Sequence, residues 1–218
     1  MRMLTSLSSK INTRHTALLV IDIQNDFLHP KGFIPKQTKG WQPVDTMVDR
    51  LIQFIENARR YQIPIIYTAN SFNSVTNSPV IMERWRRIWP GIKINLCLEG
   101  TWGADLYRLS PHPGETIVYK HRYSAFLHTD LDMLLRNLGV KTVIVTGYTT
   151  NACVETTARD AYMRDYYVVI AGDCCACQDA GLHEATLKGI EKSYGLVTTS
   201  RAILDLWSGM SKVKSPVK

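Results

Sequence analysis

Three polar residues follow apolar runs in the sequence, and together their side chains could cleave an amide bond. Asp22 follows the run at 17–21, Lys120 follows the run at 116–119, and Cys153 comes shortly after a later run. A carboxylate can accept a proton, an ammonium group can stabilise negative charge, and a thiolate can attack a carbonyl carbon. Each residue alone has a simpler explanation, since Asp22 could cap a loop, Lys120 could be solvated and Cys153 could fill the core. As a set they predict an amide hydrolase that works through a thioester.

Cys153 lies at the predicted junction between a strand and a helix. Residues 142–146 are typical of a buried strand that ends at Gly147, and a helical pattern begins near Val154. At such a junction, unpaired backbone N–H groups and the positive end of the helix dipole point at whatever lies above. We expect them to stabilise a thiolate and to be able to hold an oxyanion.

The elements that must position these residues alternate between strands and helices. Short apolar runs bounded by turn residues predict the strands, and apolar residues at three- and four-residue steps predict the helices. Strands are expected at 17–21, 63–69, 116–119, 142–146, 166–171 and 195–199, and helices at 43–61, 131–138, from about 154, 182–194 and 202–207. This order predicts an α/β fold of three layers, α/β/α, with a mainly parallel sheet of about six strands. Asp22, Lys120 and Cys153 should then share one crevice at the carboxyl ends of the strands.

The remaining segments set the predicted domain boundaries. Residues 1–16 form a loose polar arm, 17–207 a single domain and 208–218 a basic tail. Within the domain, residues 71–114 show little periodicity, and such long irregular segments usually serve as lids, binding loops or interfaces. The densest basic and aromatic part of that segment is Arg84, Trp85, Arg86, Arg87 and Trp89.

Composition and charge exclude several classes of protein. A chain of 218 residues that is 45% hydrophobic and 21% charged is typical of one soluble globular domain. No apolar run approaches a membrane span and the first residues lack the apolar part of a secretory signal, so we expect a cytoplasmic protein with no membrane partner. Five unevenly spaced cysteines do not suggest a disulfide framework. Cys174, Cys175 and Cys177 lack a second pair of ligands at a workable spacing, so no metal site is predicted there.

The formal net charge of +7 leaves two non-enzymatic alternatives to weigh. A binder of nucleic acid or of an anionic surface could use Arg84 to Arg87 and the basic tails, but no nucleic-acid motif accompanies the charge. Much of the excess charge lies at the two ends of the chain, where it is usually solvated. A non-catalytic scaffold is the other alternative, and the complete set of Asp22, Lys120 and Cys153 argues against it.

Three segments resemble the isochorismatase-like cysteine hydrolases: VIDIQNDF at 20–27, YKHRYSAF at 119–126 and VTGYTTNACVETTARDAYMRDY at 145–166. The resemblance runs from about residue 17 to residue 207 and implies that family's Rossmann-like fold. It places Asp22, Lys120 and Cys153 on the family's Asp-Lys-Cys triad. It also implies a cis peptide bond between Tyr148 and Thr149. In the family this bond aims the N–H groups of Thr149 and Cys153 at one point as an oxyanion hole.

Within the family, the chain is similar to the branch that cleaves ureido groups: ureidoacrylate amidohydrolases, biuret hydrolases and N-carbamoylsarcosine amidases. The similarity rests on KHRYSAF, on GTWG at 100–103, on Asn70 after the second strand and on the 33 positions between Lys120 and Cys153. Nicotinamidases have an Asp-x-His metal pattern after that strand, whereas this chain has NSFN at 70–73. True isochorismatases lack the nucleophile, so Cys153 argues against that activity.

The resemblance therefore implies an amidohydrolase that cleaves a linear C–N bond of a small ureido or carbamoyl compound. Ammonia or an amine would leave, and no cofactor would be needed. Hydrolysis of simple carboxamides is the alternative, and the resemblance further implies a homo-oligomer, a dimer or a tetramer.

Five residues are candidates for substrate contacts. Asn70 offers donors and acceptors that match a planar ureido group, or it could cap a loop. Arg122 could pair with a substrate carboxylate, or it could hold its own loop or a neighbouring subunit. Phe27, Trp102 and Tyr148 could form walls of the pocket, although aromatic residues at the rim of a sheet more often belong to the core.

Overall fold

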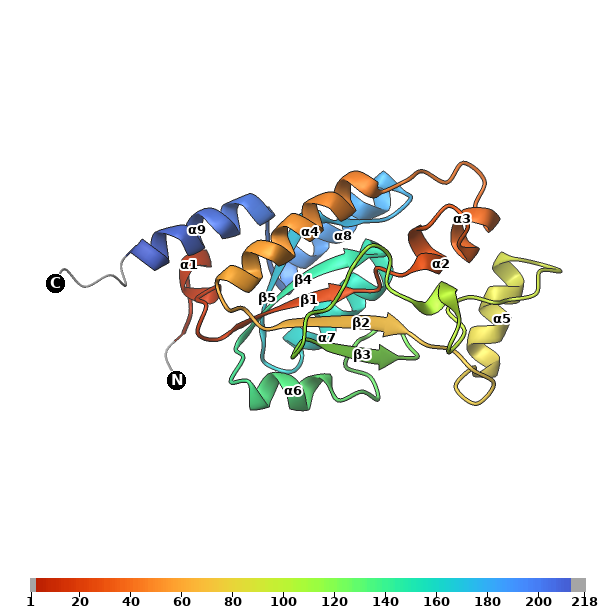
Figure 1. Ribbon diagram of the computed structural model, residues 1–218, viewed down its shortest axis with the longest axis horizontal. Helices are drawn as coiled ribbons and strands as arrows, with labels where there is room; N and C mark the ends of the chain where they lie inside the picture. Colours follow the sequence, from red (N-terminus) through yellow and green to blue (C-terminus); the bar gives the residue numbers. More distant parts are fainter. Residues whose placement is uncertain (1–2, 213–218) are drawn as a thin grey trace.

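The computed structural model describes residues 3–212, and within them it has one six-stranded sheet in the order β3-β2-β1-β4-β5-β6 (Figure 1). Every neighbouring pair of strands is parallel. The strands are β1 (Thr16–Ile21), β2 (Ile65–Asn70), β3 (Thr116–Lys120), β4 (Thr142–Tyr148), β5 (Tyr167–Ala176) and β6 (Gly195–Thr198). The prediction of an α/β fold with a parallel sheet of about six strands is confirmed.

Helices cover both faces of this sheet. The longer ones are α4 (Asp45–Arg60), α5 (Pro79–Ile88), α6 (Leu131–Asn137), α7 (Glu155–Tyr162), α8 (Ala180–Ser193) and α9 (Ser200–Lys212). Short helical segments are α1 (Leu7–Lys10), α2 (Asn25–Leu28), α3 (Phe33–Gln37), the 3-10 turn η1 (Trp102–Ala104) and the π turn η2 (Thr150–Val154). In Figure 1, α4 and α9 lie above the sheet and α6 lies below it.

The central strand β1 shows why its sequence is a continuous apolar run. Leu18 and Val20 pack into the core that contains residues of α4 and α9, and Leu19 and Ile21 pack into the core that contains residues of α6 and α7. All six residues of β1 are buried. A strand that is covered on both faces needs apolar side chains at every position, and its carboxyl end is held rigidly.

Helix α5 lies inside the segment 71–114, for which no helix was predicted from the sequence. Ser78 caps its first turn by accepting a hydrogen bond from the Ile81 N–H, and a proline follows at the first position. Trp85 is its one buried residue, and it packs edge-on against Phe72 with the ring centroids 4.9 Å apart. In Figure 1, α5 lies beyond the carboxyl ends of the strands, so it faces the predicted site.

The two ends of the chain differ from the predicted loose arm and tail. Ile11 is fully buried, and its carbonyl accepts a hydrogen bond of 2.8 Å from Nε1 of Trp207. Helix α1 precedes Ile11, and α9 runs past residue 207 to Lys212. The described part of the arm is therefore packed on the domain at Ile11, which contacts Trp207 in the middle of α9. The rest of the predicted tail, 213–218, lies outside the described residues.

Smaller differences concern the ends of elements. Helix α4 begins at Asp45 instead of 43, and β5 continues to Ala176, five residues beyond its predicted end. Within residues 3–212, no helix combines the length and the apolar character needed to cross a bilayer.

Candidate active site

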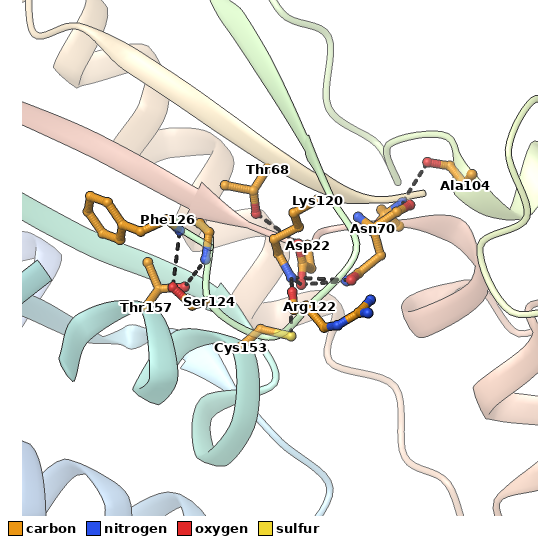
Figure 2. Close-up of polar contacts among 12 residues, drawn as sticks. Asp22, Thr68, Asn70, Ala104, Lys120, Arg122, Ser124, Phe126, Cys153 and Thr157 are labelled. Carbon is orange, nitrogen blue, oxygen red and sulfur yellow. Dashed lines mark hydrogen bonds and ion pairs between the residues drawn. The ribbon is translucent and has the colours of Figure 1, made fainter. Parts of the chain in front are cut away.

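Asp22 follows directly after β1 and is fully buried, with a left-handed φ of 52°. Its carboxylate accepts a hydrogen bond from Thr68 Oγ1 at 2.8 Å and one from Asn70 Nδ2 at 2.7 Å (Figure 2). Its Oδ2 atom lies 2.7 Å from Nζ of Lys120. Both donors come from the neighbouring strand β2, so the sheet itself fixes this carboxylate.

Lys120 is the last residue of β3 and reaches past β2 to Asp22. Its ammonium is fully buried and also donates to the carbonyl of Arg122 at 2.9 Å and to Oδ1 of Asn70 at 3.3 Å. The Cys153 sulfur lies 3.5 Å from the same nitrogen. Burial lowers the pKa of Lys120, but Asp22 and then Cys153 raise it by more, so the net pKa is raised and the group stays charged.

Cys153 lies in the π turn η2, two residues before α7 begins, and is buried. Burial and then the negative charge of Asp22 raise the pKa of the thiol to about 12, against the opposing effect of Lys120. The resting sulfur is therefore a protonated thiol. The end of the helix is not among these causes, so its stabilisation of the thiolate that forms during a reaction stays a prediction.

The turn between β4 and η2 brings Cys153 to this position. Gly147 has φ 121°, and a Cβ atom there would lie 2.1 Å from the carbonyl oxygen of Ile21. The Tyr148–Thr149 peptide bond is cis, as the resemblance implies. The Thr149 carbonyl then accepts hydrogen bonds from the N–H groups of Ala152 at 3.1 Å and Val154 at 3.3 Å. The assignment of the Thr149 and Cys153 N–H groups to an oxyanion hole stays a prediction.

His183 of α8 is a residue at this turn that the sequence did not indicate. Its Nδ1 atom lies 2.9 Å from Oγ1 of the buried Thr150, the first residue of η2. Burial lowers the pKa of His183, which favours a neutral ring at pH 7. The contact links α8 to the turn that carries Cys153.

A cavity of about 280 Å³ opens on Cys153. Its lining includes Phe27, Asn70 and Tyr148, three of the predicted substrate contacts, together with Thr149 and Cys153. Phe27 and Tyr148 form one wall, with their ring centroids 6.2 Å apart. The Asn70 amide donates a hydrogen bond to Asp22 and accepts one from Lys120. Asn70 therefore positions this ion pair in addition to lining the cavity.

The structure does not bring the other two predicted contacts, Trp102 and Arg122, to this cavity. Trp102 is half exposed and packs edge-on against His29, with the ring centroids 4.9 Å apart. The Arg122 guanidinium donates to the carbonyls of Thr76 at 3.1 Å and His121 at 2.7 Å. Arg122 therefore holds its own loop, which was the alternative weighed for it, and its carbonyl helps to hold Lys120.

The opposite wall of the cavity comes from segments whose individual residues were not predicted as contacts. These residues are Ile34, Phe72, Arg84, Trp85, Ile88, Trp89, Leu96 and Tyr123. Four of them belong to α5 or directly follow it. The basic and aromatic character of Arg84 to Trp89 indicates in the sequence that this segment is unusual. It does not indicate which of its residues line the cavity. Because Trp85 is buried against Phe72, it is not available to stack on a base.

Asp26 connects the two loops that carry these walls. Its Oδ1 atom accepts a hydrogen bond from the N–H of Phe33 at 2.9 Å, and its Oδ2 atom accepts one from Cys97 at 2.7 Å. The carboxylate is buried and its charge is used within the protein. Asp26 therefore orders the rim of the cavity.

The cysteines near the end of β5 are not among the residues that line this cavity. Cys174 and Cys175 are buried, and Cys177 donates to the carbonyl of Asp179 at 3.0 Å. In the part of the chain that the structure describes, no group of three or more His, Cys, Asp or Glu side chains is arranged to hold a metal ion.

Comparisons with known proteins agree with this fold. A family model described as the isochorismatase domain matches residues 16–202. The ureidoacrylate amidohydrolase RutB of Methylobacterium radiotolerans is 32% identical over 198 residues, covering 84% of this chain and 76% of that protein. A cysteine hydrolase from Pseudomonas syringae pv. phaseolicola superposes with a TM-score of 0.81 at 27% identity, covering 92% of this chain and 95% of that one. An N-carbamoylsarcosine amidase from Thermoplasma acidophilum superposes with a TM-score of 0.68 at 28% identity, covering 85% and 96%.

Proposed function

Because this chain belongs to the isochorismatase family of hydrolases, we propose that it cleaves a linear C–N bond of a small ureido or carbamoyl compound through a thioester on Cys153. The relatives named above include enzymes that act on ureidoacrylate and on N-carbamoylsarcosine, which supports this class of substrate. The catalytic roles fall to Asp22, Lys120 and Cys153. Ammonia or an amine is the first product.

The first half of the reaction forms the thioester. Asp22 takes the proton of the Cys153 thiol, and Lys120 stabilises the thiolate that results. The sulfur attacks the carbonyl carbon of the ureido group, and the N–H groups of Thr149 and Cys153 hold the oxyanion. Asp22 returns the proton to the departing nitrogen as the C–N bond breaks. A carbamoyl thioester stays on the sulfur.

The second half consumes one water molecule. Asp22 takes a proton from the water as its oxygen attacks the thioester carbonyl, and the C–S bond breaks. The sulfur leaves as a thiolate beside Lys120 and recovers the proton from Asp22. The products are the free enzyme and a carboxylic or carbamic acid, which keeps the second proton of the water until it ionises in the solvent.

One observation carries this proposal: a single buried ammonium lies 2.7 Å from the Asp22 carboxylate and 3.5 Å from the Cys153 sulfur. A buried charge is costly unless it is fully paired. A buried carboxylate, ammonium and thiol in contact with one another are therefore rarely found where the only role is packing. The cavity opens on the same sulfur, which gives a substrate carbonyl access to it.

The test is ammonia release from a panel of compounds. The panel contains ureidoacrylate, biuret, N-carbamoylsarcosine, nicotinamide and a small aliphatic amide. We expect turnover of at least one ureido or carbamoyl compound and, in rapidly quenched samples, a mass increase on the peptide that contains Cys153. Turnover of nicotinamide or the aliphatic amide alone would support the carboxamide alternative instead.

Two cysteine variants separate the mechanism from general thiol effects. Cys153→Ala should lose at least about 1,000-fold in kcat, because it lacks the nucleophile. Cys177→Ala is the matched control, since this half-buried cysteine is not among the residues that line the cavity. Retained hydrolysis in Cys153→Ala would contradict the thioester route.

A further inference from the structure

Arg84 is the one residue with a charged side chain among the described residues that line the cavity. The other lining residues are apolar, aromatic, amide, hydroxyl or thiol groups. The site behind the cavity adds no net charge, because Asp22 and Lys120 neutralise each other and the thiol of Cys153 is protonated. The cavity therefore carries the positive potential of one guanidinium, which favours an anion inside it.

The guanidinium of Arg84 is available for a ligand. On the same helix, Arg87 is paired with Glu83, with Nε and Oε1 3.2 Å apart. No carboxylate among the described residues forms an ion pair with Arg84, whose side chain instead lies over the ring of Tyr123 with 5.5 Å between its Cζ atom and the ring centroid. Stacking on an aromatic ring orients a guanidinium and leaves its N–H edge free for a carboxylate.

Tyr123, the ring under this guanidinium, lines the same cavity as Cys153. Burial raises the pKa of the Tyr123 phenol, Arg84 opposes this rise, and Cys153 and Lys120 also act on the same phenol. The charges of Arg84 and of the reacting groups thus act on the pKa of the same phenol. Arg84 and Cys153 line the same cavity of about 280 Å³, so a small ureido compound bound there can face both of them.

We propose that Arg84 is a specificity residue that binds a carboxylate at the end of the substrate remote from the cleaved carbonyl, so that the site selects anionic ureido or carbamoyl compounds over neutral ones. This inference rests on the proposed function. It gives Arg84 the role that was predicted for Arg122, which is to pair with a substrate carboxylate. A planar guanidinium and a carboxylate can form two parallel hydrogen bonds, which would fix the distance from the anchor to the scissile carbonyl.

The experiment compares ureidoacrylate with its methyl ester, which is neutral and nearly the same shape. Ammonia release is measured for both compounds with the wild type, Arg84→Gln and Arg86→Gln. We expect Arg84→Gln to raise KM for the acid about 10- to 100-fold and to reduce the acid-to-ester ratio of kcat/KM by a similar factor. Arg86→Gln is the matched control, because Arg86 is an exposed neighbour on the same helix and does not line the cavity. Its ratio should equal that of the wild type.

A binding measurement keeps this inference separate from the proposed function. In Cys153→Ala, the fluorescence of Trp85 and Trp89 in the cavity wall reports binding of ureidopropionate without turnover. We expect Arg84→Gln in this background to weaken binding at least about 10-fold, and Arg84→Lys to weaken it less. Equal use of acid and ester, unchanged by Arg84→Gln, would overturn the role of Arg84 and leave the hydrolase proposal intact. Absence of any hydrolysis would overturn the hydrolase, while the binding measurement would still decide on Arg84.

Discussion

Burial and the charge of Asp22 together keep the Cys153 thiol protonated at rest. The pKa of Cys153 is raised to about 12, mainly by burial and next by the charge of Asp22. Lys120 lowers it by less. A protonated thiol beside a carboxylate is a suitable starting point for the proposed chemistry, because the proton has a nearby acceptor when the substrate arrives. Asp22 is thus expected to suppress the reactivity of the sulfur toward other electrophiles.

Replacing Asp22 with asparagine should therefore change hydrolysis and alkylation in opposite directions. The variant leaves the ammonium of Lys120 beside the sulfur without its carboxylate partner, so the pKa of Cys153 should fall toward its ordinary value of 9.0 or below. Hydrolysis should fall at least about 100-fold because the base is missing. Alkylation of Cys153 by iodoacetamide at pH 8, followed by peptide mass spectrometry, should become at least about 10-fold faster.

Thr68→Val is the matched control for this experiment. It removes a hydrogen bond of 2.8 Å to Oδ1 of Asp22 but keeps the negative charge. Its alkylation rate should stay close to that of the wild type. Slower or equal alkylation in Asp22→Asn would show that the carboxylate does not control the thiol.

At the level of single residues, position at the end of a strand was a reliable signal. Asp22, Lys120 and Cys153 follow apolar runs, and parallel pairing alone places such residues at one edge of the sheet. Arg84 and Arg122 could not be separated in this way, since both lie outside the strands. The direction of an arginine side chain depends on the carbonyls and rings around it, such as those of Thr76 and Tyr123.

Among the elements, β4 meets a tight steric demand near the site at Gly147, just before the turn to η2. Gly147 pairs with Ile21 of β1 in the sheet and has a φ of 121°, a conformation that favours glycine. The backbone N, C and O atoms of Ile21 all lie within 2.8 Å of the position that a Cβ atom would take. Backbone atoms of a central strand cannot move aside without disturbing Asp22, the next residue.

Gly147→Ala should therefore destabilise the protein by roughly 3 kcal/mol or more, from the disfavoured φ together with the steric conflict. Urea unfolding followed by circular dichroism measures the change. Gly189→Ala is the matched control, because Gly189 lies inside α8 and a Cβ atom there meets nothing within 4 Å. That control should gain about 1 kcal/mol, since alanine favours a helix over glycine. Equal effects of the two substitutions would contradict the steric argument.

The elements that the sequence predicted well are those with a full apolar stripe or run. The helix at 43–61 and the strands at 17–21 and 142–146 agree with α4, β1 and β4 to within a few residues. Helix α5 was missed because its exposed basic residues hide a stripe that includes Ile81 and Trp85, and it packs only on a small separate core. The extension of β5 could not be predicted, because it depends on the irregular pairing between Val145 and Gly147.

For the whole molecule, two histidines couple folding to pH at opposite ends of the sheet. His15 precedes β1 at the amino end, and its buried Nδ1 atom has no hydrogen-bond partner among the described residues. His183 contacts η2 at the carboxyl end. Burial lowers the pKa of both rings below the ordinary value of 6.5. Between the lowered value and 6.5 the unfolded chain binds more protons, so the folded state loses stability as the pH falls through this window.

Two partly buried carboxylates, Glu115 and Asp132, act in a separate and lower window. Burial raises the pKa of Glu115, but its hydrogen bonds with Arg59 and others lower it by more, so the net value lies below the ordinary 4.5. Asp132 behaves in the same way below 3.8, through Arg136 and Tyr166. Their contribution to stability is lost only as the pH falls through those lower values. A loss of stability that begins below pH 6.5 therefore belongs to the histidines.

We expect the free energy of unfolding to fall between pH 7 and pH 5, and the double variant His15→Gln, His183→Gln to show a flatter profile. Each histidine can contribute at most about 1.4 kcal/mol per pH unit, because it binds at most one extra proton on unfolding. Urea unfolding at half-unit steps of pH measures both profiles. Since the two rings lie far apart and share no partner, the single variants should remove separate parts of the slope that add up to the effect of the double variant. A wild type with constant stability across this range, or a double variant with the full slope, would contradict the assignment to His15 and His183.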